Sequence, residues 1–206
     1  MAPLLVLVSG RGHAVDMEPE PEEVLSQQAT DGALVRAARL GDVQAFAVIV
    51  DRHGPAMYRY AVRLLHHDAD AVEVVQESFI SAWKNLHTFQ GRSNLRTWLF
   101  RLVSRRSADL QRTRRPIPIS DDLLSTMTPS AHDDPLQQAM DDELLQALRR
   151  ALAELPLHQR ASWLLREVEA MSYDEIATAL ALPVGSVRGH LHRARKALAM
   201  RMATWR

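Results

Sequence analysis

Residues 172–198 read SYDEIATALALPVGSVRGHLHRARKAL, and this stretch decides the fold. It predicts one helix over 172–181, a short turn over 182–185 and a second helix over 186–198. Ser172 followed by Glu175 three residues later matches a capping box, which marks the start of a helix. Small residues fill the first helix and basic residues crowd the second, as in motifs that lay a helix into the DNA major groove. The stretch therefore predicts a helix-turn-helix that binds duplex DNA rather than a small substrate.

The two predicted helices separate into an apolar seam and a basic face. The seam, which we assign to the core, contains Ile176, Ala177, Leu180, Leu182, Val187, Leu191, Ala194 and Leu198. The candidate DNA contacts are Ser186, Arg188, Gly189, His192, Arg193, Arg195 and Lys196. Arg188 suits a guanine edge, Ser186 and His192 suit a base or a phosphate, and the remaining cations suit phosphates. A solvated basic helix end explains any one of them equally well, but the set favours DNA.

Charge is distributed unevenly along a chain whose net charge is zero. Residues 34–115 hold fourteen Lys and Arg against seven Asp and Glu, and residues 143–206 hold ten against six. Residues 116–142 hold six acids and no Lys or Arg, and residues 1–33 hold six acids and one Arg. Two basic blocks joined by an acidic one indicate two phosphate-facing modules and a connecting segment.

The composition excludes several classes of protein and site. There is no cysteine, which removes disulfides and thiolate metal sites and fits a reducing cytoplasm. The pairs His66-His67 and His190-x-His192 diverge around a helix, so neither holds one ion, and we expect no metal and no cofactor. The apolar run at residues 4–8 is too short to span a bilayer, so we expect a soluble cytoplasmic protein without membrane insertion. Met17 is an alternative start to Met1.

The N-terminal half carries only helix signals. Residues 1–30 are expected to form a flexible extension, and Asp31 is a candidate cap for a helix over 33–40. Helices follow over 43–65, with a bend at Gly54-Pro55, from a cap at Asp68 or Asp70 through 85, and over 95–112. Residues 116–142, with four prolines, predict a linker. Asp141 or Asp142 is expected to cap a helix over 143–154, and Pro156 to open one over 157–169.

Two segments of this half are candidate interaction sites. The first is a mixed helix face next to a large aromatic ring, which suits a protein partner but also describes an ordinary amphipathic helix. Its candidate residues are Asp70, Glu73, Gln76, Glu77, Ile80, Trp83 and Lys84. The second is a polar loop that leads into a helix rich in arginine and aromatic residues, a combination that can hold unpaired bases. Its candidate residues are Arg92, Ser93, Asn94, Arg96, Thr97, Arg101 and Arg105, whereas Trp98 is assigned to the core.

These segments, taken in order, resemble the extracytoplasmic-function (group IV) sigma factors of bacterial RNA polymerase. The resemblance rests on residues 70–83, on residues 89–100 with their LRTWL sequence, and on residues 155–202 with the helix-turn-helix. It implies that residues 31–115 are sigma region 2 and residues 143–206 are sigma region 4. Residues 70–84 would bind the β′ clamp helices of core polymerase, and the 89–94 loop with the next helix would melt the −10 element and capture a flipped base. Residues 186–196 would read the −35 element, with another face on the β flap. An anti-sigma factor is implied as a further partner.

We therefore predict an all-helical, two-domain transcription initiation factor that performs no covalent chemistry. One rival is a stand-alone helix-turn-helix regulator, which leaves the N-terminal block unexplained. The other is a nucleic-acid enzyme, for which the sequence offers no paired carboxylates, nucleophile with base, or phosphate loop.

Overall fold

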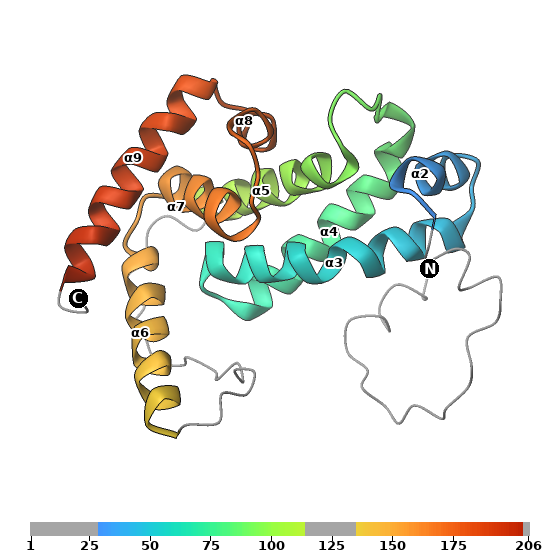
Figure 1. Cartoon of the computed structure of the whole chain (residues 1–206). Coiled ribbons are helices and arrows are strands. Elements are labelled where there is room, and N and C mark those ends of the chain that lie inside the picture. The colour runs from blue at the N-terminus through green and yellow to red at the C-terminus, as the bar shows by residue number, and fades with distance from the viewer. Residues whose placement is uncertain (1–28, 114–134, 204–206) are drawn as a thin grey trace.

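The computed structural model describes residues 29–113 and 135–203, and every regular element in them is helical (Figure 1). The all-helical class predicted from the sequence is thereby confirmed. The elements are α2(Asp31–Arg39), α3(Val43–Leu65), α4(Asp68–Asn85), η1(Leu86–Thr88), α5(Leu95–Thr113), α6(Pro135–Ala153), α7(Leu157–Trp163), the π-helical η2(Leu164–Val168), α8(Tyr173–Leu180) and α9(Val184–Arg201). The predicted extension over 1–28, including the choice between Met1 and Met17, and the linker over 116–134 lie outside the described residues.

Helices α2–α5 form what we term the N-terminal unit. The buried faces of α3, α4 and α5 meet around Tyr60, Phe100 and Leu99, all of them almost fully buried. The Tyr60 and Phe100 rings pack edge to face at 5.2 Å, and the Tyr60 hydroxyl bonds the Ser104 hydroxyl at 2.9 Å. A phenol buried at this depth needs such a partner, because an unpaired hydroxyl in a dry core is costly. Burial also raises the pKa of Tyr60, which keeps the phenol neutral.

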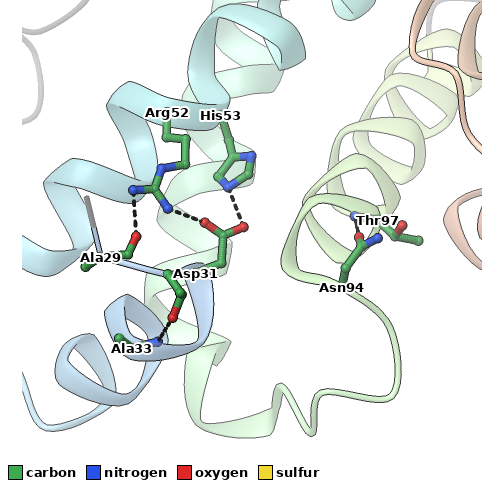
Figure 2. Close-up of polar contacts among 8 residues, drawn as sticks. Ala29, Asp31, Ala33, Arg52, His53, Asn94 and Thr97 are labelled. Carbon is green, nitrogen blue, oxygen red and sulfur yellow. Dashed lines mark hydrogen bonds and ion pairs between the residues drawn. The ribbon is translucent and has the colours of Figure 1, made fainter. Parts of the chain in front are cut away.

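Two of the predicted helix caps in this unit are wrong. Thr30, not Asp31, caps α2, with its hydroxyl accepting from the Ala33 N–H at 3.3 Å. Asp31 instead accepts from Arg52 at 2.6 Å and contacts the His53 ring at 3.0 Å, tying α2 to α3 (Figure 2). In this position the Asp31 carboxylate contacts two basic side chains, whereas as a helix cap it would accept from a single backbone N–H. The two basic partners stabilise the carboxylate more.

The cap of α4 is likewise neither Asp68 nor Asp70. The His67 ring nitrogen Nδ1 accepts from the Asp70 N–H at 3.3 Å. Asp68 accepts instead from the Tyr58 hydroxyl, and burial raises the pKa of Tyr58 to about 12. Which side chain caps α4 therefore depends on the α3 residues that contact this turn as well as on the local sequence.

Helix α3 continues through Gly54-Pro55 and carries Pro55 in its interior, and the bend that the sequence predicts there stays a prediction. Proline removes the hydrogen bond to the carbonyl four residues earlier, which belongs to Asp51. Both Asp51 and Pro55 are exposed, so this position lies on the solvent side of the helix. In the C-terminal half, α6 begins at Pro135, inside the segment predicted as linker, so Asp141 and Asp142 are not its cap.

Helices α6–α9 form the C-terminal unit, in which α7 and α8 pack against α9. The predicted seam supplies its core, since Ile176, Val187, Leu191 and Ala194 are at most 1% exposed. The capping box at Ser172 is confirmed, with Glu175 N donating to the Ser172 hydroxyl at 3.2 Å and Ser172 N donating to the Glu175 carboxylate at 2.9 Å. Among the described helices, none is both long enough and apolar enough to cross a membrane.

Arg160 joins the two units. Its guanidinium is buried without a carboxylate and donates to four carbonyls instead. Three belong to the end of α6 and the turn after it, at Leu152 (2.8 Å), Ala153 (2.5 Å) and Leu155 (2.9 Å). The fourth is Leu64 O of α3, at 2.5 Å. Burial lowers the pKa of Arg160 to about 10, which still leaves the guanidinium charged at neutral pH.

Replacing Arg160 with Met is expected to lower the free energy of unfolding by about 3 kcal/mol or more, because each buried carbonyl left unpaired costs about 1–3 kcal/mol. Urea unfolding followed by circular dichroism measures the change. The matched control is Arg150→Met on the exposed face of α6, for which we expect a change within about 0.5 kcal/mol. Equal stability of the two variants would contradict the role assigned to Arg160.

Candidate nucleic-acid interface

The second helix of the helix-turn-helix, α9, separates its apolar and basic side chains as the sequence predicts. Val187, Leu191, Ala194 and Leu198 face the core, while the basic residues lie on the opposite side. The exposed members of the predicted set are Arg188, His192, Arg193, Arg195 and Lys196, and Ser186 and Gly189 are half-buried. Pro183 begins the helix and Ala181 ends α8 in the left-handed conformation, so the turn between them is short.

Several of these cations are oriented by contacts inside the C-terminal unit. Arg188 lies over the Tyr173 ring at 5.7 Å, and Arg195 donates to the Glu167 carboxylate at 2.7 Å. Arg193 donates to His190 Nδ1 at 3.2 Å and folds back over Gly189. A Cβ at Gly189 would lie 3.3 Å from the Arg193 guanidinium, so glycine makes room for it. The face thus presents cations on one exposed helix surface, the arrangement that phosphate contacts need.

His190 takes part in this arrangement through a contact that the sequence did not predict. Its ring packs against the His158 ring of α7, with 5.7 Å between ring centroids. Burial lowers the pKa of His190, and the nearby Arg193 charge adds to this, so the ring stays neutral at neutral pH. A neutral ring can accept the Arg193 hydrogen bond, which a protonated ring cannot. His192, by contrast, points to solvent.

The second candidate site lies at the start of α5. The Asn94 side chain accepts from the Thr97 N–H at 2.6 Å and so caps the helix (Figure 2). Arg92, Asn94, Arg101 and Arg105 are exposed, Ser93 and Arg96 are half-buried, and Arg96 lies over the Phe100 ring at 5.1 Å. Thr97 is completely buried, which places its side chain inside the unit rather than on the predicted surface. Trp98 is half-buried against Phe89, in agreement with its assignment to the core.

The third candidate site is the outer face of α4. Glu73, Glu77, Ile80 and Lys84 are exposed and recur at spacings of three and four residues, so they share one stripe of the helix. Glu77 pairs with Arg106 of α5 at 3.2 Å, and Ile80 is 42% exposed although it is apolar. Gln76 is half-buried, and Trp83 packs on the Phe46 ring at 4.9 Å. Asp70 is buried beside His67, with 2.9 Å between its Oδ1 atom and the ring nitrogen Nδ1, which removes it from the predicted surface.

Comparison with known proteins identifies the family. The Sigma-70 region 2 model matches residues 49–117, and the Sigma-70 region 4 model matches residues 145–198. The RNA polymerase sigma-H factor of Pseudomonas aeruginosa is 33% identical over 180 residues, which cover 83% of this chain and 93% of the relative. The ECF RNA polymerase sigma-E factor of Escherichia coli K12 is 33% identical over 183 residues, which cover 84% and 95%.

The chain belongs to the ECF sigma factors of RNA polymerase. It acts in promoter-directed transcription initiation, as its sequence predicts. Among solved structures, CnrH in complex with the cytosolic domain of CnrY matches with a TM-score of 0.64 and 29% identity, covering 84% of this chain and 97% of that one. RpoE of Bartonella quintana, at 23% identity and a TM-score of 0.65, shares the fold.

Sequence reasoning missed the contacts that α5 makes with the C-terminal unit. Asn94 Nδ2 donates to Glu175 Oε1 at 2.7 Å, and Arg96 Nη2 donates to Glu169 Oε2 at 2.5 Å. The partners lie 81 and 73 residues apart, so no periodic signal in the sequence links them. These contacts place two of the predicted DNA-binding residues in the interface between the units.

Proposed function

We propose that this sigma factor divides its tasks between the two units and contacts a promoter at two points. The N-terminal unit, residues 31–115, binds core RNA polymerase and the −10 element. The C-terminal unit, helices α6–α9, binds the −35 element, and the acidic segment before α6 connects the two units. The observation that carries the proposal is the exposed basic face of α9, which lies opposite the buried residues Val187, Leu191, Ala194 and Leu198 of the same helix.

For the −35 element, we place α9 in the major groove with its N-terminal residues nearest the bases. Arg188 would pair with a guanine, since a guanidinium matches the two acceptors that guanine presents there. The same end of the helix would bring three more residues near the bases, namely Ser186, Gly189 and His192. The phosphates would be neutralised by Arg193, Arg195 and Lys196. The contact of Arg188 with the Tyr173 ring supports this assignment, because an oriented cation loses less entropy when it binds.

For the −10 element, we assign the loop and the first turns of α5. Arg92, Ser93 and Asn94 would grip an unpaired base, and Arg96, Arg101 and Arg105 would follow the backbone of the single strand. Melting then follows from binding energy, because these residues contact unpaired bases better than paired ones. Since Thr97 is buried, its part in this site is to support the loop through the hydrogen bond between its N–H and Asn94.

For core polymerase, we assign the exposed stripe of α4 to the β′ clamp helices and a face of the C-terminal unit to the β flap. The stripe combines carboxylates, an exposed Ile80 and Lys84, a mixture suited to a polar protein interface with an apolar centre. Gln76 flanks the stripe, while Trp83 and Asp70 support it from beneath. The synthesis of RNA remains with the polymerase, and we assign no covalent step to this chain.

We also propose that the protein acts in the cytoplasm and that an anti-sigma factor regulates it. Solved relatives support the second point, because RpoE was crystallised with the anti-sigma factor NepR and CnrH with the cytosolic domain of CnrY. The acidic 116–142 segment is suited to a cationic path on the polymerase.

Run-off transcription tests the function. Purified chain added to core polymerase from the same bacterium is expected to yield discrete transcripts from a genomic template library, whereas core polymerase alone yields none. Mapping the transcript starts should return a shared pair of upstream elements. If no template gave a specific transcript, the proposed function would be wrong.

Replacing Arg188 and His192 together with Ala is expected to weaken holoenzyme binding to the −35 duplex by about tenfold or more, because each good base contact contributes about 1–3 kcal/mol. Binding to core polymerase should be unchanged. The control, Arg150→Ala with His87→Ala, removes the same side-chain types from exposed positions elsewhere. Equal loss of DNA and polymerase binding would contradict the division of tasks.

Replacing Glu77 and Ile80 with Ala is expected to weaken the capture of core polymerase by about tenfold in a titration, because exposed charged and apolar contacts at an interface centre together contribute about 1–2 kcal/mol. The matched control is Val43→Ala with Asp51→Ala, an exposed apolar and acidic pair on α3. Unchanged capture by the α4 variant would remove this face from the proposal.

A further inference from the structure

The Tyr173 ring, at the first position of α8, contacts two guanidiniums. Arg166 of η2 lies over the ring with its Cζ atom 5.2 Å from the ring centroid, and Arg188 of α9 lies over it at 5.7 Å. Helix α8 packs against both of these elements, beside the start of α9 (Figure 1). One aromatic side chain is therefore shared by two cations, of which only Arg188 belongs to the proposed −35 face.

The ring is held in place by the segment that carries it. Ser172 and Glu175 form the capping box around Tyr173, with hydrogen bonds of 2.9 and 3.2 Å between side chain and backbone. The Tyr173 side chain is half-buried and packs against the core of the C-terminal unit. Because both its backbone and its ring are restrained, Tyr173 offers a fixed aromatic face to the start of α9.

Arg166 is fixed as well. It belongs to the π-helical η2, and its Nη1 atom donates to Met171 O at 2.8 Å across the turn that leads to α8. Single π-helical turns occur frequently at functional sites. Two positive charges close to one ring repel each other. The restrained Arg166 therefore limits the positions that the exposed Arg188 can take over the Tyr173 ring.

The contact of Arg188 differs in kind from those of its neighbours on α9. Arg195 donates to the Glu167 carboxylate at 2.7 Å and Arg193 donates to His190 at 3.2 Å, and both contacts occupy N–H donors. An aromatic face attracts a guanidinium through its charge and needs none of its N–H donors. Arg188 is thus oriented while its donors stay free for the two acceptors of a guanine edge.

We infer that Tyr173 is a positioning residue for the base contact of Arg188, and that it thereby determines part of the −35 sequence preference without touching a base. The inference rests on the −35 contact proposed above. A long arginine side chain loses rotamer entropy when a base fixes it, and a side chain already restrained by a ring loses less. The gain is realised only on a base pair whose acceptors match the restrained position, so the ring favours that pair over the others.

Run-off transcription with sub-saturating holoenzyme measures this preference. The template is a promoter found by mapping the transcript starts, together with versions in which one −35 base pair at a time is exchanged. The ratio of transcripts from the original and exchanged templates gives the preference at each pair, and the folded fraction of a variant cancels in this ratio. The pair whose preference is lost with Arg188→Ala is the pair that Arg188 reads.

Tyr173→Leu is expected to lower the preference at this pair about threefold, the factor that one exposed cation–π contact supplies, and to leave the ratios at the other −35 pairs unchanged. Tyr173→Phe should keep the preference, because it keeps the aromatic face. The matched control is Tyr58→Leu, which removes a half-buried tyrosine from α3 and should change no ratio. Equal loss at every −35 pair would indicate general packing, and equal loss with Tyr173→Phe would indicate a contact of the hydroxyl. Either result would overturn the inference.

A double variant separates positioning from an independent contact of Tyr173 with DNA. Two substitutions that act through one contact do not add. Arg188→Ala with Tyr173→Leu should therefore show the same preference at this pair as Arg188→Ala alone. A further loss in the double variant would mean that Tyr173 acts by itself, which contradicts its assignment as a positioning residue.

Failure of this inference and failure of the proposed function give different results. Absence of specific transcripts with the unchanged chain would reject the function and the inference together. A preference that is lost with Arg188→Ala but kept with Tyr173→Leu would reject the positioning role alone and leave the function in place.

Discussion

The structure depends on a buried cation that has no acid beside it. Arg160 satisfies its guanidinium with four backbone carbonyls, three at the end of α6 and one at the end of α3. The last carbonyls of a helix have no partner within that helix, and they carry the negative end of its dipole. A buried arginine between two helix ends therefore compensates both, and it fixes the positions of α6, α7 and α3 relative to one another. The charge is neutralised by dipoles, so no carboxylate had to be buried with it.

The basic surfaces also depend on where the apolar and acidic side chains lie. On α9 the apolar seam holds the helix against α7 and α8, which leaves the opposite side to arginine, lysine and histidine. The acids of the C-terminal unit are not scattered, because Glu167 orients Arg195 while Glu169 and Glu175 meet α5. A chain with a net charge of zero can thus carry two basic surfaces that are suited to binding DNA. Twelve of the balancing acids lie in residues 1–33 and 116–142, outside the two basic blocks.

This placement also joins the two units to each other. At the interface between α5 and α8, Glu175 accepts from Asn94 and Glu169 accepts from Arg96.

The sequence by itself determined the local structure and the family. Apolar spacing predicted the helices and the seam from Ile176 to Leu198, and the Ser172 capping box was correct, because these signals connect residues three or four positions apart. The exposed stripe on α4 and the basic face of α9 were predictable on the same ground. Only the tertiary structure decided the caps at Thr30 and His67, the burial of Asp70 and Thr97, and the contacts of Asn94 and Arg96 with the C-terminal unit. The physical reason is that each of these features depends on which helix packs against the residue. A carboxylate can bind any donor that packing brings close to it, and the sequence near it does not name that donor.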